Sequence, residues 1–326
     1  MLRVVVRRVL IAIPMLLASS LMVFVMTSVA GDPAPVTSAE MNPRLSEGQK
    51  QAVRVRFNLH EPVLERYWDW VSDAVRLDLG EDNAGKPVWP QIRHGFALTL
   101  RLIVVAIALA VPIAVAIGAV GALRQYSVID HVATFLSFVC FSLPVFWLAV
   151  LLKLYGGIKF NDWLGTRFFA TVGHQSADPP GGLLARLGDY AGHTILPATT
   201  LILVTAAQYS RFARSSMLDV INADYVRTAR AKGLRPSRVV LRHVLRTALI
   251  PLTTVIALDV GSLLGGVVVT ETVFQWRGMG SILIDGLRQF DVYKVSGWLL
   301  VSAAIVIGFN LVADVLYGWL DPRVRG

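Results

Sequence analysis

The chain of 326 residues is poor in residues on which disulfide-bonded, metal-binding and soluble proteins depend. It contains one cysteine, Cys140, so an internal disulfide and metal sites built on cysteine pairs are excluded. Charged residues make up only 16% of the chain, whereas a soluble globular domain has about 25%. The sequence is therefore not that of an ordinary soluble domain.

Histidine is also sparse, and its distribution argues against a catalytic or metal centre. A membrane enzyme would need a nucleophile, a histidine and a carboxylate clustered at one membrane face. The six histidines are scattered, with no spacing typical of metal ligands: His60, His94, His131, His174, His193 and His243. We expect a non-catalytic chain with no catalytic residues, no bound metal and no cofactor of its own.

Long apolar segments dominate the chain instead. Hydrophobic residues make up 55% of it and gather in blocks of about 20, the length that crosses a hydrocarbon layer about 30 Å thick. The sequence therefore predicts an all-α integral membrane protein with six transmembrane helices. The six spans cover residues 9–30, 96–122, 131–155, 194–213, 248–272 and 298–320.

The N-terminus mimics a secretory signal, because basic residues precede an apolar run that ends in Ser28-Val29-Ala30. The run over 9–30 exceeds the roughly 7–15 apolar residues of a signal peptide. We therefore interpret it as an uncleaved first span.

Basic residues orient the spans. The net charge is +9, and the excess lies at the N-terminal tip, after the second span, between the fourth and fifth spans and at the C-terminus. With six spans these four segments share one side, which is cytoplasmic by the positive-inside rule. Both termini are therefore expected in the cytoplasm, and a nucleic-acid partner is not needed to explain the charge.

The predicted organisation follows from this topology. Residues 1–30 form a cytoplasmic tip and the first span, and residues 31–95 an extracytoplasmic region. Residues 96–320 form a five-helix core with a cytoplasmic loop over 214–247, and residues 321–326 form a cytoplasmic tail.

The extracytoplasmic region holds a predicted amphipathic helix with Pro62 near its start and Gly80 near its stop. Its apolar residues recur at helical spacing: Val63, Leu64, Tyr67, Trp68, Val71, Ala74 and Val75. Two interpretations stay open, a cap packed on the spans and a docking surface for an external partner.

The segment from Gly80 to Lys86 matches the start of a phosphate-binding loop, G-x-x-x-x-G-K. The next residue is Pro87, which has no hydroxyl for magnesium, and no buried strand precedes the segment. The topology also places it outside the cell, so we expect no ATP site here.

The basic loop contains the stretch DYVRTARAKGL, residues 224–234. Asp224 is expected to cap a helix that begins at Tyr225, and Gly233 to close it in a left-handed conformation. Pro236 is expected to start a second helix that runs to the fifth span, with Pro251 in the first turn of that span. A loop that only binds lipid headgroups would need charge alone, so we predict a short helix rigidly joined to the spans on either side.

These residues carry a family resemblance. YVRTARAKGL and RHVLRTALIP, within residues 225–251, resemble the ATPase-coupling (EAA) loop of bacterial ABC importer permeases of the dipeptide/oligopeptide/nickel family. Only Ala229, Gly233 and Leu245 agree with the broad pattern, but the peptide-importer version is matched nearly residue for residue. Further similar segments are GDPA (31–34), RYWDW (66–70), GGVVVTETVFQWRGMG (265–280) and NLVADVLYGWLDPRVR (310–325).

The resemblance implies a type I ABC importer permease in the plasma membrane of a bacterium. It implies a second homologous permease, two cytoplasmic ATPases that bind ATP and Mg, an extracytoplasmic solute-binding protein and a peptide substrate. The coupling residues that it implies are Asp224, Tyr225, Arg227, Thr228, Ala229, Arg230, Ala231, Lys232, Gly233 and Leu234.

Polar residues in the spans are candidates for the translocation path. A charge at the centre of a span costs about 2.5–3.5 kcal/mol, so Asp259 in the fifth span should face either the pore or a partner in a neighbouring helix. Gln208, Thr270 and Glu271 are further candidates for the path.

Two alternatives stay open. An ion-coupled secondary transporter would often show an inverted repeat, and none is visible in this sequence. A complex of the same type could import nickel or another small solute.

Overall fold

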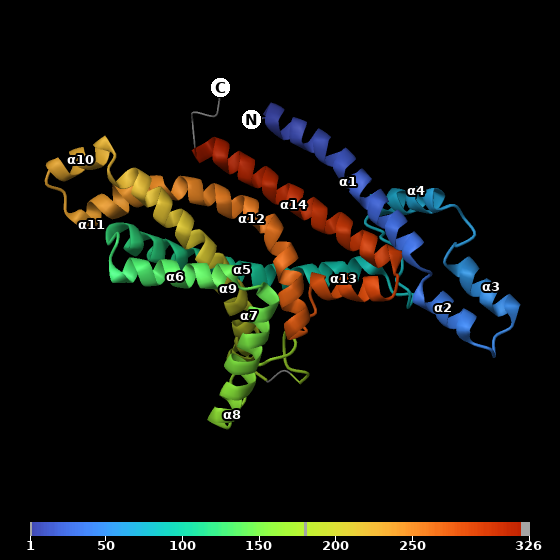
Figure 1. The fold of residues 1–326 in the computed structure, drawn as a ribbon. Coiled ribbons are helices and arrows are strands. Elements are labelled where there is room, and N and C mark those ends of the chain that lie inside the picture. Colours follow the sequence, from blue (N-terminus) through green and yellow to red (C-terminus); the bar gives the residue numbers. More distant parts are fainter. Residues whose placement is uncertain (1, 179–180, 321–326) are drawn as a thin grey trace. The chain divides into compact units, whose positions relative to one another are not determined.

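The computed structural model describes residues 2–178 and 181–320. The predicted tail, 321–326, lies outside these residues. Over the described part the secondary structure is helical, with one isolated bridge between Glu81 and Pro87 and no named strand. The chain divides into two compact units, and Figure 1 labels their helices. The first unit comprises Met1–Thr99 and Arg277–Leu311, and the second comprises Leu100–Trp276 and Val312–Gly326.

The first unit combines the N-terminal helices with two helices from the end of the chain. Its elements are α1 (Leu2–Ala30), α2 (Ala34–Met41), α3 (Glu47–Arg56), α4 (Val63–Ala74), the start of α5 (Val88–Leu123), α13 (Met279–Arg288) and the start of α14 (Val292–Leu320).

Aromatic side chains build the core of the first unit. Phe24 of α1 meets Tyr67 of α4 edge to face, with ring centroids 5.6 Å apart. The Tyr67 hydroxyl lies 2.9 Å from Ser20 Oγ, and Trp70 Nε1 donates to the carbonyl oxygen of Leu79 at 3.1 Å. The two Tyr67 contacts fasten α4 to the first span, and the Trp70 bond fastens it to the loop that follows, so both aromatic polar groups are satisfied inside the core.

Helix α4 starts where the sequence predicts but ends earlier. Pro62 is its N-terminal flanking residue, as predicted, and the helix stops at Ala74. The predicted stop at Gly80 is wrong, because the chain leaves the helix through Leu77, whose φ is 65°. A left-handed non-glycine residue is uncommon, so no glycine signalled this end.

The buried face of α4 also differs from the predicted one. Tyr67, Trp70 and Ala74 are buried, whereas Leu64 and Trp68 are more than half exposed in this chain. The helix therefore caps the first unit with one face and presents apolar side chains on another, so the docking interpretation stays a prediction.

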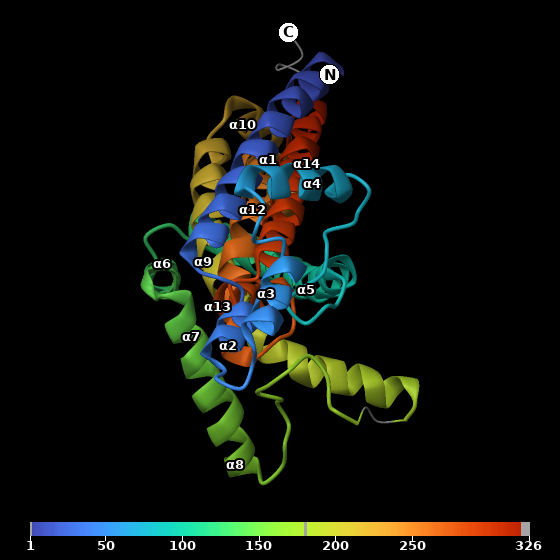
Figure 2. The same cartoon turned by 90° about the vertical axis from the view of Figure 1, so that its right-hand side faces the viewer.

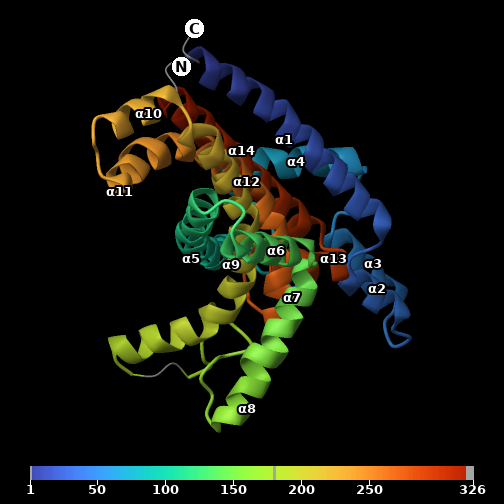
Figure 3. The same cartoon turned by 60° about the vertical axis from the view of Figure 1, so that its left-hand side comes forward.

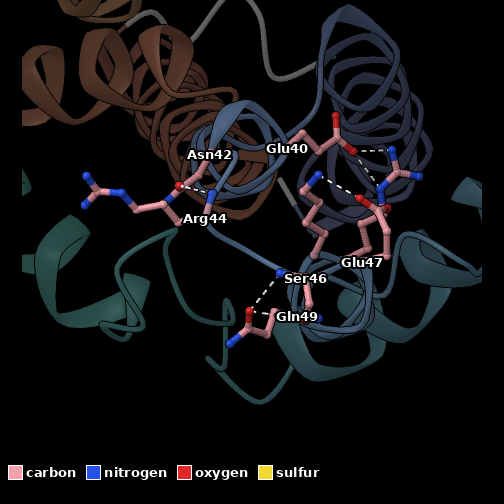
Figure 4. Close-up of polar contacts among 8 residues, drawn as sticks. Glu40, Asn42, Arg44, Ser46, Glu47 and Gln49 are labelled. Atoms are coloured by element: carbon pink, nitrogen blue, oxygen red, sulfur yellow. Dashed lines mark hydrogen bonds and ion pairs between the residues drawn. The ribbon is translucent and has the colours of Figure 1, made fainter.

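Helix α3 is exposed on all sides, and none of its residues is buried. Ser46 and Gln49 form a capping box at its start, and Glu40 of α2 forms an ion pair with Arg54 of α3 (Figure 4). Local polar contacts of this kind contribute little individually. These contacts therefore hold the α2–α3 hairpin only weakly, and its buried residues all belong to α2.

The loop that matches a phosphate-binding motif is bound to the start of α14. Asp82 Oδ1 accepts the amides of Ala84 and Lys86 at 3.0 and 2.8 Å, and Asp82 Oδ2 lies 3.2 Å from Lys294 Nζ. Asp291 accepts the amides of Asn83 and Lys294 at 2.8 and 3.0 Å. The loop is thus fastened to the N-terminus of α14 by these contacts, which we call the polar clasp.

The second unit contains the remaining helices, shown from two further sides in Figures 2 and 3. They are the rest of α5, α6 (Val128–Ser142), α7 (Val145–Leu151), the π-helix η1 (Leu152–Lys159), α8 (Phe160–Leu164), α9 (Leu183–Ile221), α10 (Asp224–Ala231), α11 (Pro236–Val239), the π-helix η2 (Val240–Val244) and α12 (Leu245–Phe274).

Small residues line the contact between α5 and α9 in the second unit. Ala110 and Ala114 of α5 pack with Ala206 and Ala213 of α9. A Cβ added at Gly118 would lie 2.7 Å from Ala213 Cβ. Helix backbones therefore approach closely here, as small residues allow at helix contacts in membranes.

The number of candidate spans agrees with the predicted six. Among the described residues, five helical stretches are long and apolar enough to cross a membrane. The pair formed by α6 and the segment from α7 to α8, bent by 103° before Val145, adds a sixth when it counts as one span. The five stretches are Val6–Met41, Val88–Leu123, Leu183–Ile221, Pro236–Ile256 and Val292–Leu311.

Candidate coupling and translocation sites

The predicted coupling helix is present as α10, and its C-terminus closes as the sequence predicts. Gly233 is left-handed with φ 73°. Its amide donates to the carbonyl oxygen of Arg230 at 2.9 Å, and the amide of Leu234 donates to that of Ala229 at 3.4 Å. This pair of bonds is a Schellman motif, which stops the helix abruptly.

The predicted N-terminal cap is wrong. Asp224 is the first residue of α10 rather than its cap, and Ala223 occupies the cap position without a side-chain hydrogen bond. Asp224 still suits this position, because a carboxylate in the first turn interacts favourably with the helix dipole.

An apolar cluster anchors α10 to three longer helices. Val226 and Ala229 are the buried residues of α10. They pack with residues of α5, α9, α11, η2 and α12: Ala122, Met217, Val239, Val244 and Ala248. A displacement of α10 must therefore move these helices as well, since packed interiors are close to solid.

The other face of α10 is exposed and cationic. Of the ten predicted coupling residues, Ala229 is buried and Leu234 is half-buried, and the rest are exposed. Arg227, Arg230 and Lys232 are among the exposed residues. The helix thus offers a polar contact face while it is rooted in the second unit.

The second predicted helix runs into the fifth span without a break. Pro236 occupies its first turn, as predicted, and α11, η2 and α12 follow one another directly. Pro251 therefore lies inside α12, and its predicted place in the first turn is wrong. The reason is that the continuous helix begins at Pro236, well before residue 248, where the apolar segment places the start of the span.

An ion pair that the sequence did not single out joins α6 to α9 next to this site. Arg214 Nε and a terminal nitrogen donate to the two carboxylate oxygens of Asp130 at 2.7 and 2.8 Å. Asp130 is 3% exposed and also accepts the amide of Tyr126 at 3.0 Å. The spacing Ser127-x-x-Asp130, which starts α6, marked a helix start but not its distant partner.

Two of the predicted path residues lie together. Gln208 Nε2 of α9 donates to Asp259 Oδ2 of α12 at 2.9 Å, although the residues are 51 positions apart. A neighbouring helix thus supplies Asp259 with a hydrogen-bond partner, which is one of the two roles expected for it. Its place in the pore stays a prediction.

The other two path residues lie further along α12. Thr270 and Glu271 are both fully buried in this chain, and they are roughly 16 Å beyond Asp259 at 1.5 Å per residue. Nearby, Lys153 Nζ donates to the carbonyl oxygen of Val273 at 2.6 Å. The structure therefore does not bring Thr270 and Glu271 together with Gln208 and Asp259.

Comparison with known proteins identifies the protein family to which this chain belongs. The family model described as "Binding-protein-dependent transport system inner membrane component" matches residues 110–326, and its N-terminal companion matches residues 1–120. The chain belongs to this family of transport-system membrane components. A member of this class functions as a transport component with partner ATPase and substrate-binding proteins, and it is a bacterial inner-membrane protein rather than an enzyme.

The individual relatives are peptide permeases. The oligopeptide transport system permease protein OppB of Mycobacterium tuberculosis (strain ATCC 25618 / H37Rv) is 40% identical over 325 residues, covering 100% of this chain and 99% of the relative. AppB of Bacillus subtilis, an oligopeptide permease, is 35% identical over 324 residues and 98% of each chain. The dipeptide permease DppB of Escherichia coli K12 is 33% identical over 338 residues, covering 100% of this chain and 99% of the relative.

Solved structures support the fold alone. The MetNI methionine ABC transporter in an inward-facing conformation matches with a TM-score of 0.53 at 15% identity, over 72% of this chain and 96% of that chain. An amino acid ABC transporter matches with a TM-score of 0.50 at 13% identity, over 70% and 93%. The predicted family and all-α importer-permease fold are confirmed, and the secondary-transporter alternative is set aside.

Proposed function

We propose that this chain is the membrane-spanning permease subunit of an ATP-driven importer of oligopeptides or dipeptides that a solute-binding protein delivers. The relatives that support this carry oligopeptide and dipeptide permease names at 33–40% identity over nearly their whole length. A nickel or other small-solute importer would have the same architecture, so the substrate is the part that experiment must decide.

The complex that we propose contains a second, homologous permease and two cytoplasmic ATPases, which bind ATP and Mg. This chain binds neither. Both termini and α10 lie on the cytoplasmic side, because the basic segments gather there.

The observation that carries the mechanism is the construction of α10. Its cationic face is exposed, while Val226 and Ala229 are buried in a cluster shared with α5, α9 and α12. When ATP closes the ATPases, α10 moves with its ATPase and carries the ends of α9 and α12 with it. These spans tilt and open the path outward to the loaded binding protein, and hydrolysis resets it inward.

Within the path, Asp259 and Gln208 are proposed to face the peptide. A carboxylate held by a side-chain amide at 2.9 Å can accept the terminal ammonium of a peptide or a basic side chain. Thr270 and Glu271 belong to the outer end of the same path and come into contact with substrate when α12 tilts.

The decisive test is copurification of the tagged chain from native membranes, followed by ATPase and uptake assays. We expect two ATPases and a second permease to copurify, with hydrolysis stimulated by the peptide-loaded binding protein. A chain that comes out without ATPases under mild detergent would contradict the proposal. ATP hydrolysis that is stimulated by nickel but by no peptide would show that the substrate is nickel and not a peptide.

A further inference from the structure

We propose that the groove between α6 and α9 is a subsite for the C-terminal carboxylate of a peptide in transit, with Arg211 as its anchor. This inference rests on the proposed function and names one more part of the same path. The groove has a volume of about 600 Å³, within the range of about 300–1,000 Å³ typical of small-molecule sites. Its lining residues include Thr134, Phe138, Phe141, Gln208, Arg211 and Phe212.

Two aromatic rings hold the guanidinium of Arg211. It lies 4.4 Å from the centroid of the Phe138 ring and 5.3 Å from that of Phe141. Ring faces attract a cation within about 6 Å, and they leave the hydrogen-bond donors at the guanidinium edge available. A planar guanidinium in this setting matches a carboxylate with two parallel hydrogen bonds.

Arg211 is the basic group of the groove that is not already neutralised. The other basic lining residue, Arg214, is committed to Asp130 through two hydrogen bonds. Among the residues whose side chains the structure describes, no acidic group lies within ion-pair distance of Arg211. The groove therefore carries one uncompensated positive charge beside apolar walls, which favours an anion with an apolar body.

Gln208 connects this groove to the carboxylate of Asp259. It lines the groove and donates to Asp259 at 2.9 Å. Gln208 and Arg211 are three residues apart on α9, so their side chains lie on the same helix face. Gln208 of α9 thus links the anion-binding Arg211 on the same helix to the cation-binding Asp259 on α12.

This pairing favours a peptide over an anionic lipid headgroup. A zwitterionic peptide has both terminal charges, whereas a lipid phosphate satisfies Arg211 and is repelled by a nearby carboxylate. The rings of Phe138, Phe141 and Phe212 offer surfaces for apolar side chains without selecting one shape. Recognition of the termini alone suits a path that must pass peptides of many sequences.

The test compares two forms of one substrate. The complete complex is reconstituted into vesicles and supplied with a random tetrapeptide mixture, either with free C-termini or amidated, and uptake is expressed per loaded binding protein. We expect Arg211→Gln to reduce uptake of the free acids by about tenfold and to leave uptake of the amides unchanged. Arg211→Lys, which keeps the charge but not the planar fork, is expected to retain part of the preference.

Arg186→Gln is the matched control, since Arg186 is an exposed arginine of the same helix outside the groove. An equal fall for acids and amides in Arg211→Gln would overturn the inference, and so would no change in either. A defect present in vesicles with phosphatidylglycerol but absent in pure phosphatidylcholine would assign Arg211 to lipid instead. If the unaltered complex takes up neither mixture, the proposed function itself fails.

Discussion

The two units differ in the size of the side chains that pack between their helices. The first unit has a core of large aromatic residues, including Phe24, Tyr67 and Trp70, and a polar clasp between the 80–88 loop and α14. In the second unit, alanines and Gly118 let α5 and α9 approach closely, beside two larger buried residues. Large rings fill the space between elements in the first unit, whereas small residues allow close helix contact in the second. The comparison teaches that the second unit tolerates added volume least where its helix backbones approach each other.

The largest effect is expected at the C-terminus of α10, where we propose that the second unit receives motion from an ATPase. Gly233→Val places a β-branched residue at φ 73°, which such residues strongly disfavour. The Schellman closure is then lost, and peptide uptake is expected to fall at least tenfold while the complex still assembles. Gly233→Asn is the control, because asparagine tolerates this conformation. Uptake unaffected by valine would show that the shape of α10 is not needed for coupling.

The Asp130–Arg214 pair tests whether α6 and α9 move together. Asp130→Asn leaves Arg214 without its carboxylate, and breaking a buried pair costs about 3 kcal/mol or more. A double-mutant cycle with Arg214→Gln, read from thermal unfolding of the purified complex, is expected to show a coupling energy above about 1 kcal/mol. Additive effects would mean that the two helices are held by packing alone.

The close crossing of α5 and α9 predicts intolerance of a single methyl group. In Gly118→Ala the new Cβ would lie 2.8 Å from the amide nitrogen of Arg214 and from the carbonyl oxygen of Ser210, so backbone must shift. Overpacking of this kind costs about 2 kcal/mol, measurable as a lower midpoint of thermal unfolding. Gly308→Ala is the control, since its Cβ would meet nothing within 4 Å. Equal unfolding midpoints for Gly118→Ala and Gly308→Ala would show that α5 and α9 are not closely packed at Gly118.

The smallest effect on stability is expected in the polar clasp of the first unit, and this effect depends on pH. Burial alone would raise the pKa of Asp82, but hydrogen bonds from Lys86, Gln91 and Lys294 hold it below its usual value. Its stabilising contribution is therefore present above the unfolded pKa of about 3.9 and is lost as pH falls through the lower folded pKa. Asp82→Asn should cost about 1.5 kcal/mol at pH 7 and flatten the acid side of the stability profile.

Asp291→Asn is the matched control for that profile. Burial raises the pKa of Asp291 despite the amides that it accepts, so its ionised form costs stability near neutral pH. Asparagine caps a helix as well as aspartate does, and the expected change is under about 0.5 kcal/mol. Amide hydrogen exchange of residues 80–88, measured as a function of pH, would report the local stability of the loop in both variants. If Asp291→Asn lost more stability at neutral pH than Asp82→Asn, the stabilising carboxylate would be Asp291 and not Asp82.

The sequence predicts the elements of this fold better than their contacts. Apolar length fixes a span, and Gly233 with Pro236 fixes the turn after α10, because these signals are local. The pair of Gln208 with Asp259 and that of Asp130 with Arg214 join helices far apart in the chain. Each residue is visible in the sequence, but its partner depends on how helices pack. The errors at Asp224, Gly80 and Pro251 concern helix ends, where neighbouring turns compete.

The π-helix η2 fixes the angular phase of α12. Each residue of an α-helix turns the chain by about 100°, and a π-turn accommodates an additional residue within one continuous helix. Deleting one residue of η2 would rotate everything after it by that angle relative to α10. Asp259 would then turn away from α9, although no residue of the pair had been altered. The orientation of the proposed path is thus set at Val240–Val244, before Asp259 in the chain, by the number of residues in this turn and not by their side chains.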